Sequence, residues 1–362
     1  MLTKIIFKRV FAIFGVVNNF LLIIFIIFKS PKQFGNYKCL MAYISIFEIF
    51  YSILDFLTVP TIYSHNSAFL VIIEKDSAIF PDSLLQVANI SFCSLFGMSM
   101  AIFAIHFVYR LLVMIGPKYL YHYHLQKVLG LIGCTIIVGC GWTVVMHISF
   151  GPTKYSDSLI SLEYLEPRNL TLSDVDYVGA HFHHTDSYGN QFINWNSMIA
   201  LVMMTIAIML SFTTVILCGL KIYKDAQENL SLRSSTDNNI QSQIFWALVL
   251  QTIIPVVLMH FPAGIGYLFS MLNRSTEILG EIPAITIFMY PALDPLPSFF
   301  IIRSYREAIL GNLKLKSIEE KNYAEKFSEL LGCKKSEMSV IPTEMSLQVI
   351  RTPAGKTPEE NR

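Results

Sequence analysis

Seven stretches of this chain are long and apolar enough to cross a lipid bilayer as helices. Each contains between 19 and 28 residues and no lysine or arginine, and about 20 helical residues span the hydrocarbon core. Hydropathy places them at residues 10–28, 39–63, 87–109, 128–150, 193–220, 244–271 and 282–302. The sequence therefore predicts an all-α membrane protein, a seven-transmembrane helix bundle, followed by a tail at 303–362 that begins as a short helix and continues as a largely disordered stretch.

The composition argues against a soluble catalytic domain. Hydrophobic residues make up 53% of the chain and charged residues only 15%, whereas soluble domains carry about 25% charged residues. Phosphate-binding, metalloprotease and serine-hydrolase motifs are absent from the sequence. We expect no enzyme, no cofactor, no metal site and no nucleic-acid partner. The loop residues His181, His183, His184 and Asp186 are interpreted as ordinary polar loop residues rather than a metal cluster.

The distribution of basic residues predicts the orientation of the bundle. Twenty lysines and arginines lie in the first, third and fifth loops and the tail, and only four lie in the other loops. Because basic residues favour the cytoplasmic side, we expect the C-terminus inside the cell and residues 1–9 outside, although Lys4, Lys8 and Arg9 weakly oppose this. The acidic fourth loop carries the sequon 169–171, so Asn169 is predicted to be glycosylated.

Three polar residues lie at one depth in the predicted bundle. Asn19, Glu48 and Asp294 are each nine residues from the expected cytoplasmic end of their span, which is roughly 13 Å of helix. The spans contain no lysine or arginine, so the two carboxyl groups require protons, hydrogen-bond partners or a bound cation. Two interpretations stay open: a static packing cluster, or a switch or ion site.

The seventh span is interrupted by prolines. Pro291, Pro295 and Pro297 flank Asp294 within seven residues. Each proline removes a backbone donor from the helix, so the freed carbonyl groups need other partners. We therefore expect a kink or a deformable site here, with Asp294 and Pro295 at its centre.

Several motifs together make the chain recognisable. They are Ser30-Pro31-Lys32 with Tyr37-Lys38, Gly97-Met98-Ser99-Met100-Ala101 running to Tyr109-Arg110, Gln251-Thr252 with Ile254-Pro255, Pro-x-x-Asp-Pro-Leu-Pro at 291–297, and Phe-Ile-Ile-Arg-x-Tyr-Arg at 300–306. In order and spacing, from about residue 10 to 310, they resemble the nematode seven-transmembrane chemoreceptors of the Str superfamily.

The resemblance implies a G protein-coupled, olfactory-type receptor. Its expected partners are a heterotrimeric G protein, a small odorant-like molecule and the lipid bilayer, and its expected location is the plasma membrane of a sensory cilium. Tyr109-Arg110 stands where rhodopsin-like receptors carry Asp-Arg-Tyr, and Asp294-Pro295 where they carry Asn/Asp-Pro-x-x-Tyr. This chain has no acidic residue at position 109, and the fourth loop lacks the cysteine of the usual disulfide bond.

Two sets of candidate site residues are predicted, and depth counting gives the first of them. The ligand set lies in the half of the bundle expected to be extracellular: Phe92, Cys93, Phe96, Trp195, Met198, Met259, His260, Tyr267, Thr286 and Phe288. The expected G protein contacts are Tyr109, Arg110, Lys221, Lys224, Arg303 and Arg306. A seven-span ligand-gated channel or transporter is the alternative function, and a receptor-like protein that signals to nothing is a third.

Overall fold

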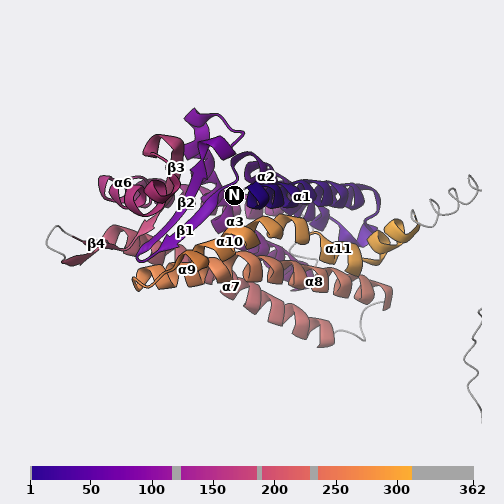
Figure 1. The fold of residues 1–362 in the computed structure, drawn as a ribbon. Helices are drawn as coiled ribbons and strands as arrows, with labels where there is room; N and C mark the ends of the chain where they lie inside the picture. Colours follow the sequence, from indigo (N-terminus) through magenta and orange to yellow (C-terminus); the bar gives the residue numbers. More distant parts are fainter. Residues whose placement is uncertain (1, 116–123, 186–189, 229–234, 312–362) are drawn as a thin grey trace, which may run out of the picture. The chain divides into compact units, whose positions relative to one another are not determined.

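Seven membrane-length helices form the structure, a computed structural model that describes residues 2–115, 124–185, 190–228 and 235–311 (Figure 1). The seven-helix fold predicted from the sequence is confirmed. Five spans are continuous helices, and the sixth and seventh are each divided. The helices are α1 (Leu2–Phe28), α2 (Tyr37–Thr58), α3 (Leu85–Ile115), α5 (His124–Ser149), α7 (Trp195–Glu228), α8 (Ser235–Pro255) with α9 (Phe261–Met271), and α10 (Glu277–Leu293) with α11 (Leu296–Ile301).

Short helical segments occupy the loops. They are η1 (Lys32–Phe34), η2 (Lys75–Ser77), η3 (Asp82–Leu84), α6 (Lys154–Ile160), η4 (Ser161–Leu165), η5 (Glu166–Arg168) and η6 (Leu172–Asp174). Residues 303–311, which follow the seventh span, are also helical. The remainder of the predicted tail lies outside the described residues.

A three-stranded antiparallel sheet, which was not predicted from the sequence, covers one end of the bundle. Its order is β1 (Thr61–His65), β2 (Ala68–Glu74), β3 (Val175–His181). A separate pair joins β4 (His183–Thr185) to β5 (Gln191–Ile193). The predicted second span, 39–63, therefore extends too far. Helix α2 ends at Thr58, and the next residue, Val59, adopts a positive φ of 47°.

The central strand β2 is apolar on both faces because both faces are covered. Phe69 and Val71 pack in the main core of the helix bundle. Leu70 and Ile72, which alternate with them, pack in a second cluster with residues of α6 and η4. A strand buried on both sides loses the alternation of polar and apolar residues that identifies a half-buried strand.

The two divided spans break at prolines. In the sixth, the wide helical segment η7 (Val256–His260) lies between Pro255 and Pro262, each of which lacks a backbone donor. In the seventh, the chain turns at Asp294 and Pro295 between α10 and α11. Both breaks lie beside the side chains described below.

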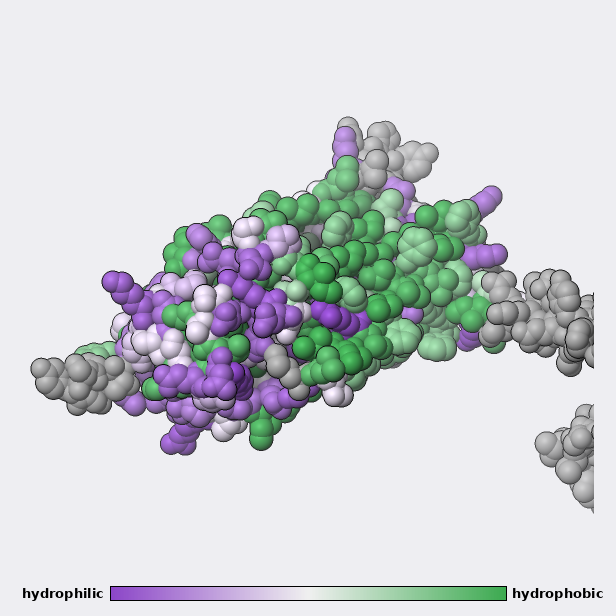
Figure 2. Space-filling model, turned by 45° about the horizontal axis from the view of Figure 1, so that its top comes forward, coloured by the Kyte–Doolittle hydropathy of each residue, from purple (hydrophilic) through white to green (hydrophobic). Residues whose placement is uncertain are grey.

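The two ends of the bundle differ in the polarity of their surfaces. In Figure 2, apolar side chains cover the helices and polar side chains gather over the sheet. We call the end that carries β1–β3 the sheet end and the opposite end, with η1 and α11, the α11 end. The start of α1 lies at the sheet end, where Lys4 pairs with Glu281 at 2.7 Å and Lys8 donates to the Pro60 carbonyl at 2.7 Å.

Candidate functional site

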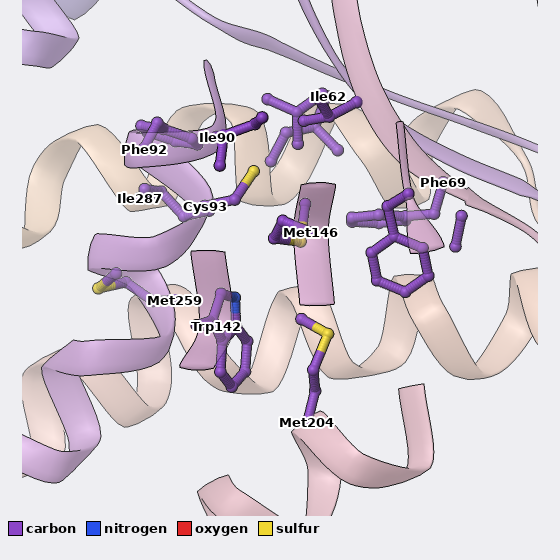
Figure 3. Close-up of a cluster of buried hydrophobic side chains, with 14 of the residues drawn as sticks. Ile62, Phe69, Ile90, Phe92, Cys93, Trp142, Met146, Met204, Met259 and Ile287 are labelled. Carbon is purple, nitrogen blue, oxygen red and sulfur yellow. The ribbon is translucent and has the colours of Figure 1, made fainter. Parts of the chain in front are cut away.

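A small cavity of about 40 Å³ lies in the sheet-end half of the bundle, and we call it the enclosed cavity because most of the side chains that line it are buried. Figure 3 shows the apolar side chains of this region converging from helices and strands. They come from α3, α5, α7, α9, α10 and the sheet. The lining residues are Ile62, Phe69, Val71, Phe92, Cys93, Phe96, Trp142, Met146, Met204, Ala263, Tyr267 and Ile287.

Four residues of the predicted ligand set line this cavity: Phe92, Cys93, Phe96 and Tyr267. His260 lines a larger hollow next to it. Met198, Met259 and Phe288 pack in the bundle but do not line the enclosed cavity.

Two predicted ligand residues are not brought to the interior. The side chain of Trp195 is 67% exposed on the outer surface, and the Thr286 hydroxyl donates to the Ile282 carbonyl of its own helix at 3.1 Å. Depth counting fixes the height of a residue along a helix but not the face from which its side chain projects.

Trp142 and the sheet residues of the cavity were not predicted from the sequence. A methyl group on Gly97 would lie 2.1 Å from the Trp142 ring, so this glycine allows α3 and the tryptophan of α5 to pack closely. A glycine and a tryptophan at similar depth in consecutive spans are the signal that could have found this contact. Ile62 and Phe69 could not be found in this way, since their strands were not predicted.

A series of aromatic contacts leads from the cavity toward the middle of the bundle. The ring of Phe92, on the cavity wall, stacks on Tyr51 with centroids 5.4 Å apart. Tyr51 meets Tyr290 edge to face at 6.3 Å, and the Tyr290 hydroxyl donates to Glu48 at 3.0 Å. Side chains in direct contact therefore connect the cavity to the predicted polar layer.

The polar layer is one buried cluster. Asn19, Glu48 and Asp294 are each 1% exposed or less, and Gln251 donates to Asp294 at 3.1 Å. The Ser298 hydroxyl donates to the Gln251 side-chain oxygen at 3.3 Å. Buried carboxyl groups need hydrogen-bond donors, and Gln251 and Tyr290 supply one each, to Asp294 and Glu48.

Asn19 also supplies the hydrogen bond that Pro295 removes. In a continuous helix, the backbone N–H of position 295 would donate to the carbonyl of Pro291, four residues earlier. Pro295 has no N–H, and Asn19 donates to that carbonyl at 2.9 Å instead. Asn18 donates to the next carbonyl, that of Ala292, at 2.8 Å. The break in the seventh span is thus held by side chains of the first.

Arg110 is buried at the α11 end and not displayed on the surface. Only 3% of it is exposed. Its guanidinium lies 5.3 Å from the centre of the Tyr37 ring and donates to the Gln241 carbonyl of α8 at 3.2 Å. Tyr37 also stacks on Tyr109, which is buried as well. These contacts join α3 to α2 and α8 without any acidic residue at position 109.

The other residues of the predicted G protein set are exposed. Lys221 and Lys224 lie near the end of α7, and Arg303 and Arg306 lie after α11. Arg303 pairs with Glu307 at 2.6 Å. The buried Tyr305 explains part of the 300–306 motif, because its ring contacts Phe25 and its hydroxyl bonds Ser30.

The predicted glycosylation residue lies at the sheet end. Asn169 is exposed and adopts a positive φ of 53°. In contrast, the asparagine of the sequon at 89–91 is fully buried, and its side chain donates to the Val71 carbonyl at 3.1 Å, which ties α3 to the sheet.

The histidines of the fourth loop lie in strands β3 and β4. His181 is buried beside His184, with ring centroids 4.8 Å apart, and burial lowers the pKa of His181 to about 4. Among the residues that the structure describes, no three metal-ligating side chains gather at one point. Asp186, the acidic member of the group noted in the sequence, lies outside the described residues.

Three comparisons place the chain among known proteins. Residues 4–310 match the family model described as "Serpentine type 7TM GPCR chemoreceptor Str". The "G-protein coupled receptor str-217" of Caenorhabditis elegans is 31% identical over 83% of this chain and 87% of that protein. The "Serpentine receptor class r-10" of the same organism is 28% identical over 80% of this chain and 85% of that protein. Squid rhodopsin has a similar fold, with a TM-score of 0.59, 13% identity, and coverage of 86% and 85%.

Proposed function

The chain belongs to the Str family of serpentine seven-transmembrane chemoreceptors, and from this premise we propose how it binds its ligand and signals. The ligand is a small, mainly apolar molecule that binds against the side chains around the enclosed cavity, which must move apart to admit it because the space is only about 40 Å³. Binding favours a state in which the α11 end accepts a heterotrimeric G protein. The sheet end then faces outward, at the plasma membrane of a chemosensory cilium.

The observation that carries this proposal is the contact series from the cavity to the polar layer. A ligand that displaces Phe92 also acts on Tyr51 and Tyr290, and through them on Glu48 and Asp294. Asp294 lies at the break of the seventh span, where the helix is easiest to deform. The layer is therefore suited to a switch, since its hydrogen bonds can be exchanged for others of similar energy.

Arg110 holds the α11 end closed in this proposal. Its contacts with Tyr37 and with the α8 backbone join three helices. A G protein that needs the space beside Arg110 can enter only when α8 moves away. The exposed basic residues Lys221, Lys224 and Arg306 then form the rim of the docking surface.

A channel or transporter, the alternative class, has less support. The family that matches residues 4–310 is described as G protein-coupled, and the relatives are named as receptors. A receptor-like protein without signalling activity is distinguished from an active receptor by the experiment below.

The test uses cells that express the full chain with a G protein reporter and a panel of small apolar compounds. Cys93→Leu adds volume at the cavity wall, and Cys140→Leu makes the same change at an exposed position on α5. We expect Cys93→Leu to weaken responses to the larger active compounds by roughly tenfold, as for a loss of about 1.4 kcal/mol, and Cys140→Leu to respond normally. Equal responses of both variants at equal surface expression would place the ligand elsewhere.

A further inference from the structure

A second, larger cavity opens on the side of the bundle. We call it the α7–α9 cavity. It lies between α7 and the η7–α9 segment, and Phe96, Met100 and Trp142 form its inner wall. Its volume is about 630 Å³, within the roughly 300–1,000 Å³ usual for small-molecule sites. Residues on its rim, such as Val202 of α7 and Phe261 of α9, are exposed among the apolar side chains that face lipid in a membrane.

The two cavities share a wall. Phe96, Trp142, Met204, Ala263 and Tyr267 line both the α7–α9 cavity and the enclosed cavity. A molecule in the larger space therefore touches the same aromatic side chains that surround the smaller one.

The sheet closes the direct route from the sheet end. The Phe69 ring of β2 packs on the Tyr267 ring with centroids 4.1 Å apart. A methyl group on Gly266 would lie 2.4 Å from the Phe69 ring, so α9 also packs closely against the sheet. Strand β3 is tied to the end of α5, where the Gly179 N–H donates to the Phe150 carbonyl at 2.9 Å.

A charged cleft of about 590 Å³ at the sheet end offers another route. Among the lining residues, only Ile62 is common to this cleft and the enclosed cavity. Charged side chains, including Lys4, Arg168 and Glu281, line the cleft. An apolar molecule gains little there compared with the lipid-facing hollow.

A histidine provides the polar contact on the inner side of the α7–α9 cavity. His260 ends the wide segment η7, and its Nε2 bonds the Ser99 hydroxyl at 3.0 Å. Its other ring nitrogen is buried and bonds no atom of the described residues. Four of the twenty lining residues carry a side-chain nitrogen or oxygen, so the cavity suits an apolar body with few polar atoms.

We propose that the ligand enters from the bilayer through the α7–α9 cavity, and that it is an apolar molecule with one hydrogen-bonding oxygen, an alcohol or a carbonyl compound, which His260 binds. This deepens the proposed function, since it names the route and the chemical class of the ligand. Partition into the bilayer concentrates such molecules next to the opening. The closed sheet end then has no part in ligand entry.

The test measures binding without signalling. The full chain in lipid nanodiscs is exposed to a photoreactive medium-chain alcohol, and the labelled peptides are identified by mass spectrometry. A Cβ added at Gly264, which lines the cavity, would meet no atom within 4 Å, so Gly264→Phe places a large side chain at the cavity wall. Gly141 of α5 is equally open but does not line the cavity, which makes Gly141→Phe the matched control.

We expect label on α7 and α9, a roughly tenfold loss of this label in Gly264→Phe, and no loss in Gly141→Phe. His260→Phe should reduce labelling by the alcohol but not by a photoreactive alkane of equal length. Even labelling of all lipid-facing helices, unchanged by Gly264→Phe, would show adventitious partition only and overturn the proposal. Loss of label in Ile62→Trp alone would also overturn it, in favour of the charged cleft. A receptor that binds the probe but activates no G protein contradicts the proposed function, not this inference.

Discussion

Replacing Tyr37 should raise the activity of the receptor without ligand. The Tyr37 ring faces the Arg110 guanidinium at 5.3 Å in a buried environment, where a cation–π contact is worth about 2 kcal/mol. If this contact exists only in the resting state, Tyr37→Leu destabilises that state by about 1–2 kcal/mol, which changes the equilibrium constant by a factor of roughly 5–30. Starting from an active population of about 1%, basal activity would rise to roughly 5–25% of the maximum.

The assay is basal nucleotide exchange on the G protein, normalised to receptor at the cell surface. Tyr37→Phe keeps the ring and loses only the 3.3 Å contact of the hydroxyl with His106, so its basal activity should stay near that of the unmodified receptor. Phe25→Leu removes similar volume from the same apolar cluster without contacting Arg110, which controls for loss of packing. The reasoning is refuted if Tyr37→Leu leaves basal activity unchanged, or if Phe25→Leu raises it equally.

Three further predictions concern the polar layer and the sheet end. Asp294→Asn should reach the surface with altered basal activity, whereas Asp294→Leu should be impaired more severely because it leaves buried polar partners unpaired at about 1–3 kcal/mol each; normal signalling by the leucine variant would reduce the layer to packing. Asn169 should carry a glycan, so glycosidase should change the gel mobility of the unmodified receptor and of Thr171→Ser but not of Thr171→Ala; no change in any of them would count against the assigned orientation. Burial lowers the pKa of His181 to about 4, so the unfolded chain binds more protons between pH 4 and about 6.5, and thermal stability in detergent should fall as pH falls through this window; His181→Gln should flatten that dependence.

The hydrophobic spans and the polar layer could be predicted because their physical causes are local. A helix in lipid must satisfy its own backbone and present an apolar surface, so its length and hydropathy are visible in consecutive residues. The depth of Asn19, Glu48 and Asp294 follows from helical rise alone. The break at Pro295 follows from its missing N–H.

The sequence did not predict which face of each helix points into the bundle. Most lipid-facing and core-facing residues are apolar in a membrane protein, so periodicity does not separate the two sides as it does in water. Trp195 and Phe92 are both large aromatic residues of the kind that line ligand sites. Only Phe92 lines the cavity, whereas Trp195 is exposed. Which face of a helix points inward depends on its neighbours.

The sequence by itself determined the seven-helix bundle, its depth layers and the motifs that identify its family. Only the tertiary structure decided the sheet, the cavities and the partners of Arg110. Strand β2 pairs with β3 about a hundred residues later in the chain, and Arg110 meets the backbone carbonyl of Gln241 on a distant helix. A strand covered on both faces shows no polar alternation, and a backbone carbonyl is offered by every residue, so neither contact leaves a pattern in the sequence.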